Sequence, residues 1–427
     1  MHDLLVKNGM VFTYIHEGYH ALKLRQADIL IKNGVIVKIA PDISESCEEL
    51  DAAGCMVLPG MINMGSASVA SKLLAGLLPD QRAVDGTLVH TRVLPVVDAA
   101  AEMLDDEALN AVALCALWDG LSGGTTTAVD ICPPRFATAV KKAGDTLEMR
   151  LFRAVTACDR TAPRVVNSLP VPGRAILAQG IGLGDYPAIF SFETASDMLA
   201  QEVAGTKGPR FAGAAYSASE SGRPIKKLSD MGFLSAGTVL WQCVYADARD
   251  RELMAWSGSS AALSAVTCAQ EGKKYPAVDF LRSGINTALM TGFYGNCMIS
   301  EMRAAAFAAK QAEGDAAQYQ ATDALYAATV AGARALGMQD TLGRVDMGMS
   351  GDVSVVSMAR FEPLSYPFIQ YLYGAAPSDV RHVACRGRVI KKDYAPADFI
   401  SASLQSAVTA AQAAVQAVWQ EAIARIL

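Results

Sequence analysis

Hydrophobic and polar residues alternate through much of the first 58 residues, with the two-residue period of β-strands. The clearest predicted strands are Ala27–Lys32 and Val35–Ile39. Asn33 and Gly34 separate them, and both residue types tolerate the positive φ angles of a two-residue turn. The sequence therefore predicts a β-hairpin at this point.

The same pattern occurs close to both ends of the chain. Leu4–Lys7 and Val11–Tyr14 flank another Asn-Gly pair, and we expect them to form two separate strands. Asp352–Ser357 and Val380–Ile390 are also strand-like, and Gly387 interrupts the second of them.

The long region between these strands alternates short apolar strands with helices, which is typical of a (β/α)₈ barrel. Asp105–Leu121 is a predicted helix, because acidic residues fill its first turn and apolar residues recur at helical spacing. A Ser-Gly-Gly sequence ends it, and Thr125–Asp130 follows as a strand. Further predicted elements are strands at Val239–Tyr245, Ala262–Thr267 and Thr287–Thr291 and a helix at Glu301–Gln311.

The tail from Pro396 to Leu427 is predicted to form one amphipathic helix. Its apolar stripe consists of Leu404, Val408, Ala411, Val415 and Val418. We expect this helix to pack on the barrel or on a second subunit.

Composition narrows the class of protein. The chain has 427 residues, of which 52% are hydrophobic, so it can bury a large core. The net charge of −6 and the lack of basic stripes disfavour nucleic acid and anionic membranes as partners, and a small molecule is the expected one. The N-terminal sequence has no signal-peptide pattern, and no apolar run has the length of a membrane span. Nine cysteines without a CxxC pair are typical of a reduced, cytoplasmic protein.

Four motifs together carry a family resemblance. They are Pro59–Asn63, Gly124–Asp130, Ala331–Gly337 and Gly351–Val356. In combination they resemble the amidohydrolase superfamily, most closely its branch of chlorohydrolases, cytosine and guanine deaminases and S-adenosylhomocysteine deaminases. The resemblance implies an α/β protein with a TIM-like (β/α)₈ barrel at residues 59–344. It also implies a small β-sandwich built from residues 1–58 and 345–394, a C-terminal helix at 395–427, and a homodimer.

The resemblance further implies a mononuclear metal held by five side chains, but the matching positions here are poor ligands. The His-x-His pair of the first barrel strand corresponds to Gly65 and Ala67, whose side chains donate no electron pair. The ligands of strands five, six and eight correspond to Ser217, Gln242 and Gly292. We therefore expect no metal and no other cofactor.

Several polar residues near the predicted barrel mouth are candidates for function. Glu220 matches the family's proton-shuttling glutamate, and His90 is the one histidine of the barrel region, so we expect both to be catalytic. The simpler alternative for Glu220 is a carboxylate that caps the next helix, and for His90 it is a partly exposed histidine of a helix. The predicted substrate-binding residues are Ser217, Gln242, Tyr245 and Thr291. Regular pleating points Gln242 and Tyr245 to opposite faces, so only a bulge or a strand end brings both into one pocket.

Other polar residues favour structural interpretations. Asp130 ends a predicted strand. We favour a structural role for it, as the partner of Arg153 or Arg160 in an ion pair, over a catalytic role. Cys132, Cys268 and Cys297 follow the predicted strand ends, and we interpret them as small buried hydrophobic residues.

Three functional hypotheses follow from the sequence. The first is a divergent, metal-independent enzyme that acts on C–N bonds of a small nitrogenous compound. The second is a non-catalytic family member that binds a small molecule or serves as a scaffold or regulatory subunit. The third is an ordinary metallohydrolase whose ligands lie elsewhere, which the shortage of barrel histidines disfavours.

Overall fold

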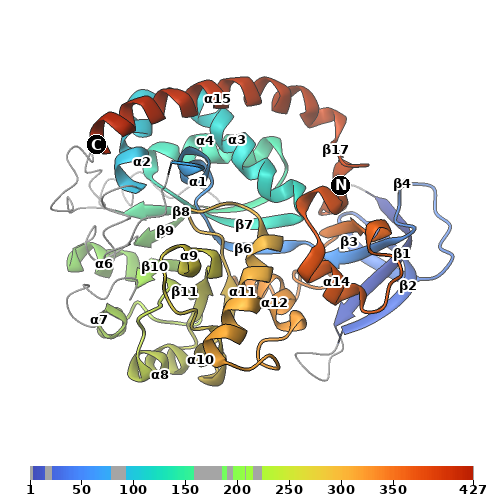
Figure 1. Ribbon diagram of the computed structural model, residues 1–427, viewed down its shortest axis with the longest axis horizontal. Coiled ribbons are helices and arrows are strands. Elements are labelled where there is room, and N and C mark those ends of the chain that lie inside the picture. The colour runs from blue at the N-terminus through green and yellow to red at the C-terminus, as the bar shows by residue number, and fades with distance from the viewer. Residues whose placement is uncertain are drawn as a thin grey trace.

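Two β-sheets organise the molecule. The computed structural model describes residues 3–14, 22–77, 93–157, 185–189, 196–206, 208–214 and 224–426. An eight-stranded sheet of parallel neighbours lies at the centre of the chain, and a nine-stranded sheet combines strands from both ends of it (Figure 1). The fold class is therefore the predicted one, a TIM-like barrel with an additional β domain. The division at residues 58, 344 and 394 stays a prediction.

The barrel strands follow one another around the sheet in sequence order. They are β6 (Met61–Ser66), β7 (Thr125–Cys132), β8 (Arg150–Ala157), β9 (Asp185–Ile189), β10 (Arg210–Ala214), β11 (Thr238–Gln242), β12 (Ser260–Leu263) and β13 (Thr287–Leu289). A parallel bridge between Ser66 and Gly292 brings the first and last strands together. Because all these strands are parallel, their carboxyl ends meet at one mouth, where barrel enzymes carry their active sites.

The second sheet joins the two ends of the chain. Its strands are β1 (Leu4–Tyr14), β2 (Leu22–Lys32), β3 (Val35–Ala40), β4 (Glu48–Asp51), β5 (Cys55–Pro59), β14 (Val353–Ser357), β15 (Val380–Cys385), β16 (Arg388–Lys392) and β17 (Ala395–Pro396). The junction is the antiparallel pairing of β5 with β14. The predicted hairpin at Asn33-Gly34 is confirmed as the turn between β2 and β3.

The first predicted pair of strands is wrong in one respect. Leu4–Lys7 and Val11–Tyr14 belong to the single strand β1, and the pairing with β2 shifts by one residue between Val6 and Gly9. Asn8 adopts a φ of 62° at this bulge, so the Asn-Gly pair bends the strand instead of reversing it.

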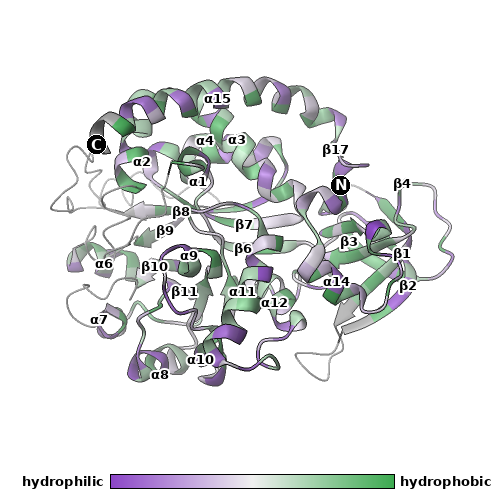
Figure 2. Ribbon diagram, in the orientation of Figure 1, coloured by the Kyte–Doolittle hydropathy of each residue, from purple (hydrophilic) through white to green (hydrophobic). Residues whose placement is uncertain are grey.

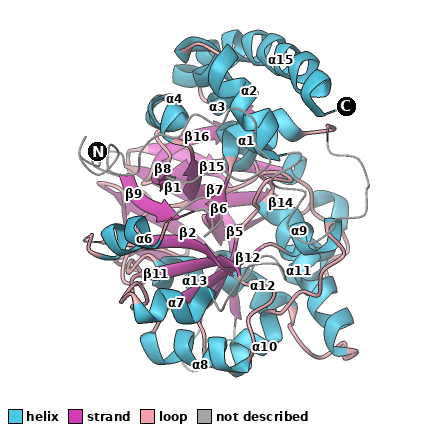
Figure 3. Cartoon of the chain, turned by 90° about the vertical axis from the view of Figure 1, so that its left-hand side faces the viewer, coloured by secondary structure: helices cyan, strands magenta, loops and turns pink. Residues whose placement is uncertain are grey.

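Helices cover the barrel on its outside (Figure 3). They are α1 (Ser68–Leu74), α2 (Leu94–Met103), α3 (Asp106–Ser122), α4 (Pro134–Thr146), α6 (Asp197–Ala204), α7 (Pro224–Asp230), α8 (Ala248–Ser257), α9 (Ala265–Gln270), α10 (Ala277–Arg282), α11 (Met298–Glu313), α12 (Ala321–Ala328), α13 (Val330–Ala335), α14 (Pro367–Gly374) and α15 (Asp398–Ile426). Figure 2 shows hydrophilic stretches on the outer helices α7, α8 and α10. Within the described ranges, no helix combines the length and apolar character needed to cross a bilayer.

Local capping explains where two of these helices begin. The predicted helix at Asp105–Leu121 is confirmed as α3, and the Asp105 side chain caps it by accepting the Ala108 N–H. The predicted strand at Ala262–Thr267 is wrong beyond Leu263. Ser264 accepts the Thr267 N–H at 3.0 Å and starts α9 there, so a cap overrides the β-branched residues that follow.

The C-terminal helix α15 lies along α3 and α2 (Figure 1). The predicted stripe is partly wrong, because Val408 is 46% exposed. The buried hydrophobic positions of α15 are Ile400, Leu404, Ala407, Ala411, Ala414, Val418 and Ala422. Most of the buried positions of α15 are alanines, whose small side chains allow close packing against α3.

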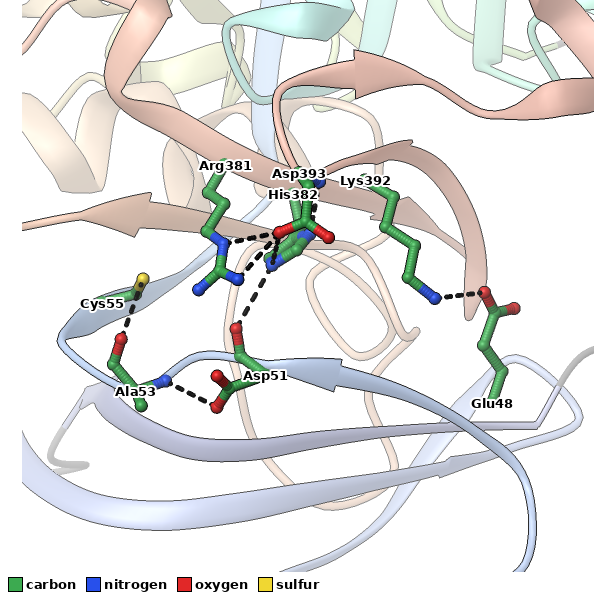
Figure 4. Close-up of polar contacts among 8 residues, drawn as sticks. All are labelled: Glu48, Asp51, Ala53, Cys55, Arg381, His382, Lys392 and Asp393. Carbon is green, nitrogen blue, oxygen red and sulfur yellow. Dashed lines mark hydrogen bonds and ion pairs between the residues drawn. The ribbon is translucent and has the colours of Figure 1, made fainter.

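The β-sandwich holds a buried histidine with a defined tautomer (Figure 4). His382 Nδ1 accepts the Asp393 N–H at 3.1 Å, so the proton of the neutral ring sits on Nε2 and points to the Asp51 carbonyl at 3.2 Å. Burial lowers the pKa of His382 below its usual value of 6.5. This histidine lies in the sandwich, so it serves the sheet and not the barrel mouth.

Candidate functional site

The pleat of β6 and β7 shows which side chains face the barrel interior. A Cβ on Gly332 of the outer helix α13 would meet Ile62 at 2.8 Å and Met64 at 3.4 Å, so these two side chains point outward. Asn63 and Gly65 alternate with them and therefore face inward. On β7, Val129 pairs with Phe152 and faces inward, whereas Asp130 pairs with Arg153, which reaches α4, and therefore faces outward.

Met290 fills the space beside Gly65. A Cβ at Gly65 would lie 2.6 Å from Met290 Cε and 3.1 Å from its Sδ. Position 65 therefore has no room for a larger side chain unless Met290 moves.

Thr291 and Asn63 form a closed polar pair across the seam of the barrel. Asn63 Nδ2 donates to Thr291 Oγ1 at 2.8 Å, and Asn63 Oδ1 accepts the Thr291 N–H at 3.1 Å. The hydroxyl of Thr291, a predicted substrate-binding residue, thus has a buried partner in Asn63 within the protein.

Gln242 and Tyr245 lie beyond the regular part of β11. The strand ends at Gln242 and not at Tyr245 as expected, because Gln242 and Cys243 adopt φ angles of 65° and 50°. Gln242 Oε1 accepts the Ser264 N–H at 3.4 Å, and its Nε2 lies 3.9 Å from the Cβ position of Gly292. The strand end thus brings Gln242 next to the end of β13.

Tyr245 belongs to a charged cluster on the rim. Its ring lies 5.6 Å from Lys273 Nζ, and Lys273 forms an ion pair with Glu271 at 2.8 Å. The Tyr294 hydroxyl lies 3.4 Å from Glu271 Oε1. Tyr245 is 41% exposed, so the three segments that follow β11, β12 and β13 meet at a partly open surface.

Glu301 is a buried carboxyl group, which the sequence indicated only as the first residue of a predicted helix. It lies in the first turn of α11 and accepts the N–H groups of Ala265 and Val266 at the start of α9. The Ser264 hydroxyl donates to its Oε2 at 3.1 Å. Burial raises the pKa of Glu301 to about 8, and these hydrogen bonds oppose the rise. The carboxyl group holds the loop after β12 in place.

Asp130 is a second buried carboxyl group, close to the carboxyl end of β7 and beside the start of α1. It is 1% exposed, and its Oδ2 accepts the Ser68 N–H at 3.0 Å. Burial raises the pKa of Asp130 to about 7. Arg153, the expected partner, instead donates to the Ala137 carbonyl of α4 on the outside of the barrel. Arg160, the alternative partner, lies outside the described residues.

Four aromatic rings line the interior on consecutive strands. Ring centroids lie 5.7 Å apart for Phe152 and Tyr186, 6.3 Å for Tyr186 and Phe211, and 5.6 Å for Phe211 and Trp241. The indole N–H of Trp241 donates to the Met64 carbonyl at 2.9 Å, although β11 and β6 are not neighbours in the sheet. Trp241 therefore reaches across the interior, and the four rings form one aromatic face there.

The residues described at the family's metal positions do not fit a divalent ion. Gly65, Ala67 and Gly292 have no donor side chain, and Gln242 provides only a neutral amide that bonds to Ser264. Across the described ranges, no three side chains of His, Cys, Asp or Glu come together.

Three predicted site residues, His90, Ser217 and Glu220, lie outside the described residues, and their roles stay predictions. The cysteines near the strand ends are consistent with small hydrophobic residues, since Cys132 and Cys268 are buried. Cys297 is half-buried and caps α11 through the Ser300 N–H at 3.4 Å. Glu301 is a buried carboxyl group that the sequence did not single out, because it lies in the first turn of a helix and no motif marks its contacts with α9.

Comparison with known proteins identifies relatives along most of the chain. Residues 275–391 match the model of the Amidohydrolase family. The 5-methylthioadenosine/S-adenosylhomocysteine deaminase of Syntrophobacter fumaroxidans is 27% identical over 92% of this chain and 93% of its own. The protein of the same name from Natronomonas pharaonis is 29% identical over 92% and 93%.

Solved structures agree on the fold. An adenosine deaminase from Xanthomonas campestris, solved with bound zinc, has a TM-score of 0.83 at 20% identity and covers 97% of this chain and 99% of its own. The guanine deaminase of E. coli has a TM-score of 0.79 at 16% identity and covers 92% and 99%.

These relatives correct the functional expectation. The hypothesis of a non-catalytic member is wrong, because the relatives that match nearly the whole chain are named as deaminases. The absence of a metal stays a prediction, since the similarity to these enzymes extends far beyond the few substituted ligand positions. Residues 275–391 of the chain therefore form a region of the Amidohydrolase family.

Proposed function

We propose that this protein hydrolyses a C–N bond of a small nitrogenous compound, and that its substrate is an aminopurine nucleoside. The observation that carries the proposal is the whole-length similarity to proteins named 5-methylthioadenosine/S-adenosylhomocysteine deaminase. In such a reaction water adds to the ring carbon that bears the amino group, ammonia leaves, and the ring retains a carbonyl.

The interior supports a planar substrate. The rings of Phe152, Tyr186, Phe211 and Trp241 give flat apolar surfaces, on which an aromatic heterocycle stacks with about 0.5–1.5 kcal/mol per ring pair beyond its area burial. The net charge of −6 agrees with a neutral or zwitterionic substrate better than with a polyanionic one.

The test is ammonia release from S-adenosylhomocysteine, 5′-methylthioadenosine, adenosine and guanosine by untagged protein. The assay is run both with added zinc and after treatment with a chelator, and the metal content is measured. We expect at least one of these nucleosides to be deaminated. Release from none of them in either sample, by protein that unfolds cooperatively on heating, would contradict the proposal.

A further inference from the structure

We propose that the hydroxyl of Thr267 and the side-chain amide of Gln242 form a subsite for the amino-bearing edge of a 6-aminopurine. Thr267 accepts from the amino group, and Gln242 donates to the ring nitrogen beside it. The inference rests on the proposed function and names the residues that would give it specificity for the base.

The subsite is a gap beside Gly292 at the carboxyl end of the barrel. Gly292 follows β13, has a φ of 64° and carries no side chain. Its N–H donates to the Gly65 carbonyl at 2.8 Å, and its own carbonyl accepts the Ala67 N–H at 3.3 Å. Both backbone groups are therefore occupied, and they fix the edge of the gap against the end of β6.

Three side-chain atoms border the place where a Cβ on Gly292 would lie. Thr267 Oγ1 is 3.0 Å from this place, and Gln242 Nε2 and Met290 Cε are each 3.9 Å from it. A distance of 3.0 Å is shorter than most contacts that a Cβ makes, but it is normal for an N–H group that donates to an oxygen. The gap therefore suits a nitrogen that donates to Thr267 better than it suits a carbon atom.

The Thr267 hydroxyl is buried and has no hydrogen-bond partner among the described residues. The residue is 2% exposed, and its backbone is held in place because its N–H donates to the Ser264 hydroxyl at 3.0 Å. Glu301 fixes the same loop by accepting the N–H groups of Ala265 and Val266. A fixed, buried hydroxyl that lacks a partner is a group that a bound ligand can satisfy.

The amide of Gln242 faces this gap with its nitrogen. Its Oε1 accepts the Ser264 N–H at 3.4 Å, and its Nε2 is the amide atom that lies close to the Cβ position of Gly292. An amide nitrogen donates hydrogen bonds and accepts none, whereas a hydroxyl can do either. The gap therefore has a donor in Gln242 and an available acceptor in Thr267.

This arrangement matches one edge of a 6-aminopurine. Its exocyclic amino group donates hydrogen bonds, and the ring nitrogen beside that group accepts them. The amino group fits at Thr267 Oγ1, and the ring nitrogen fits at Gln242 Nε2. A purine that lacks the amino group keeps the contact with Gln242 and loses the contact with Thr267.

The experiment compares adenosine with purine riboside, which lacks the amino group and keeps the ring nitrogens. Thr267→Val replaces the hydroxyl by a methyl group of similar size. We expect this variant to raise the KM for adenosine about 3–10-fold, the net value of one hydrogen bond. The inhibition constant of purine riboside stays that of the parent protein. An unchanged KM for adenosine, or equal changes for the two nucleosides, would overturn the assignment.

Thr125→Val is the matched control. Thr125 is 1% exposed and its hydroxyl also lacks a partner among the described residues, but it is the first residue of β7, at the opposite end of the barrel. We expect this variant to leave the constants of both nucleosides unchanged. A shift like that of Thr267→Val would show that the effect does not come from the proposed subsite.

Thr267→Ser and Thr267→Ala are the variants to compare if Thr267→Val does not fold. Serine keeps the hydroxyl, so we expect Thr267→Ser to retain the parent's preference for adenosine over purine riboside. Thr267→Ala is expected to lose part of that preference. The same preference in both variants would contradict a contact between the hydroxyl and the amino group.

If the parent protein deaminates none of the nucleosides, the proposed function fails separately, and the subsite is decided by binding. Calorimetry then gives the dissociation constants of adenosine and purine riboside. Weaker binding of adenosine to Thr267→Val, with unchanged binding of purine riboside, supports the subsite. Equal changes for the two nucleosides, or no binding of adenosine to the parent protein, overturn it.

Discussion

Replacing Glu301 tests how the loop after β12 is held. In Glu301→Ala the N–H groups of Ala265 and Val266 lose their acceptor, and the Ser264 hydroxyl loses a partner. Leaving a buried donor unpaired costs about 1–3 kcal/mol, so the two N–H groups alone give a loss of about 2–6 kcal/mol. The Ser264 hydroxyl adds little, because it still accepts the Thr267 N–H.

Glu301→Gln is the matched control. Its carbonyl oxygen can accept the same backbone N–H groups, and its amide can donate to the Ser264 hydroxyl. We therefore expect a loss below about 1.5 kcal/mol, the net value of one ordinary hydrogen bond. Urea midpoints of the three proteins, compared at equal slope, give the difference.

The pH dependence of these variants has a definite sign. Burial raises the pKa of Glu301 from 4.5 to about 8, so the folded protein holds this proton more tightly than the unfolded chain does. The stability due to this group is full below pH 4.5 and is lost as the pH rises to about 8. We expect Glu301→Gln to gain on the parent protein over this range. A Glu301→Ala variant as stable as Glu301→Gln at every pH would refute the reasoning, because it would show that the carboxyl group holds nothing in place.

Three further predictions concern packing and charge. Burial lowers the pKa of His382, so below pH 6.5 the imidazole takes up a proton more readily in the unfolded chain than in the folded protein. We therefore expect His382→Gln to lose less stability than the parent protein as the pH falls from 6.5. Parallel pH profiles of thermal unfolding for the two proteins would argue against this. Gly65→Ala places a Cβ only 2.6 Å from Met290 Cε, and we expect it to cost about 1–3 kcal/mol of unfolding free energy. In the double variant with Met290→Ala this clash is relieved, so its loss of stability is smaller than the sum of the two single losses. Losses that simply add in urea unfolding would exclude this contact. Arg150→Ala leaves Asp352, whose side chain is 6% exposed, without its ion-pair partner. We expect the free energy of unfolding, measured with denaturant, to fall by about 3–5 kcal/mol. A change within error would show that this pair does not join the barrel to the sandwich.

Much of the fold could be predicted because its signals are local. The hairpin at Asn33-Gly34 needs two adjacent residues with positive φ, and α3 needs a capping Asp105 and an apolar repeat. Local signals also misled at two places. The bulge at Asn8 resembles a turn, and the cap at Ser264 ends a strand that residue types alone would extend.

The candidate site was harder to predict, since its contacts join distant segments. The Trp241 indole reaches Met64, which lies 177 positions away in the chain, and Asp130 bonds to Ser68, 62 positions away. Neither hydrophobic periodicity nor a motif indicates which oxygen of Asp130 is occupied or that Met290 fills the space beside Gly65.

The sequence by itself determined the family resemblance, the order of strands and helices, and the replacement of ligating side chains at positions 65, 67 and 292. These follow from residue identity and from periodicity, which act within a few residues. Only the tertiary structure decided that the carboxyl group of Asp130 is buried against the start of α1, and that Glu301 is occupied in holding α9. Burial and hydrogen bonding set the pKa values of both groups, and both depend on what the closed barrel brings together in space.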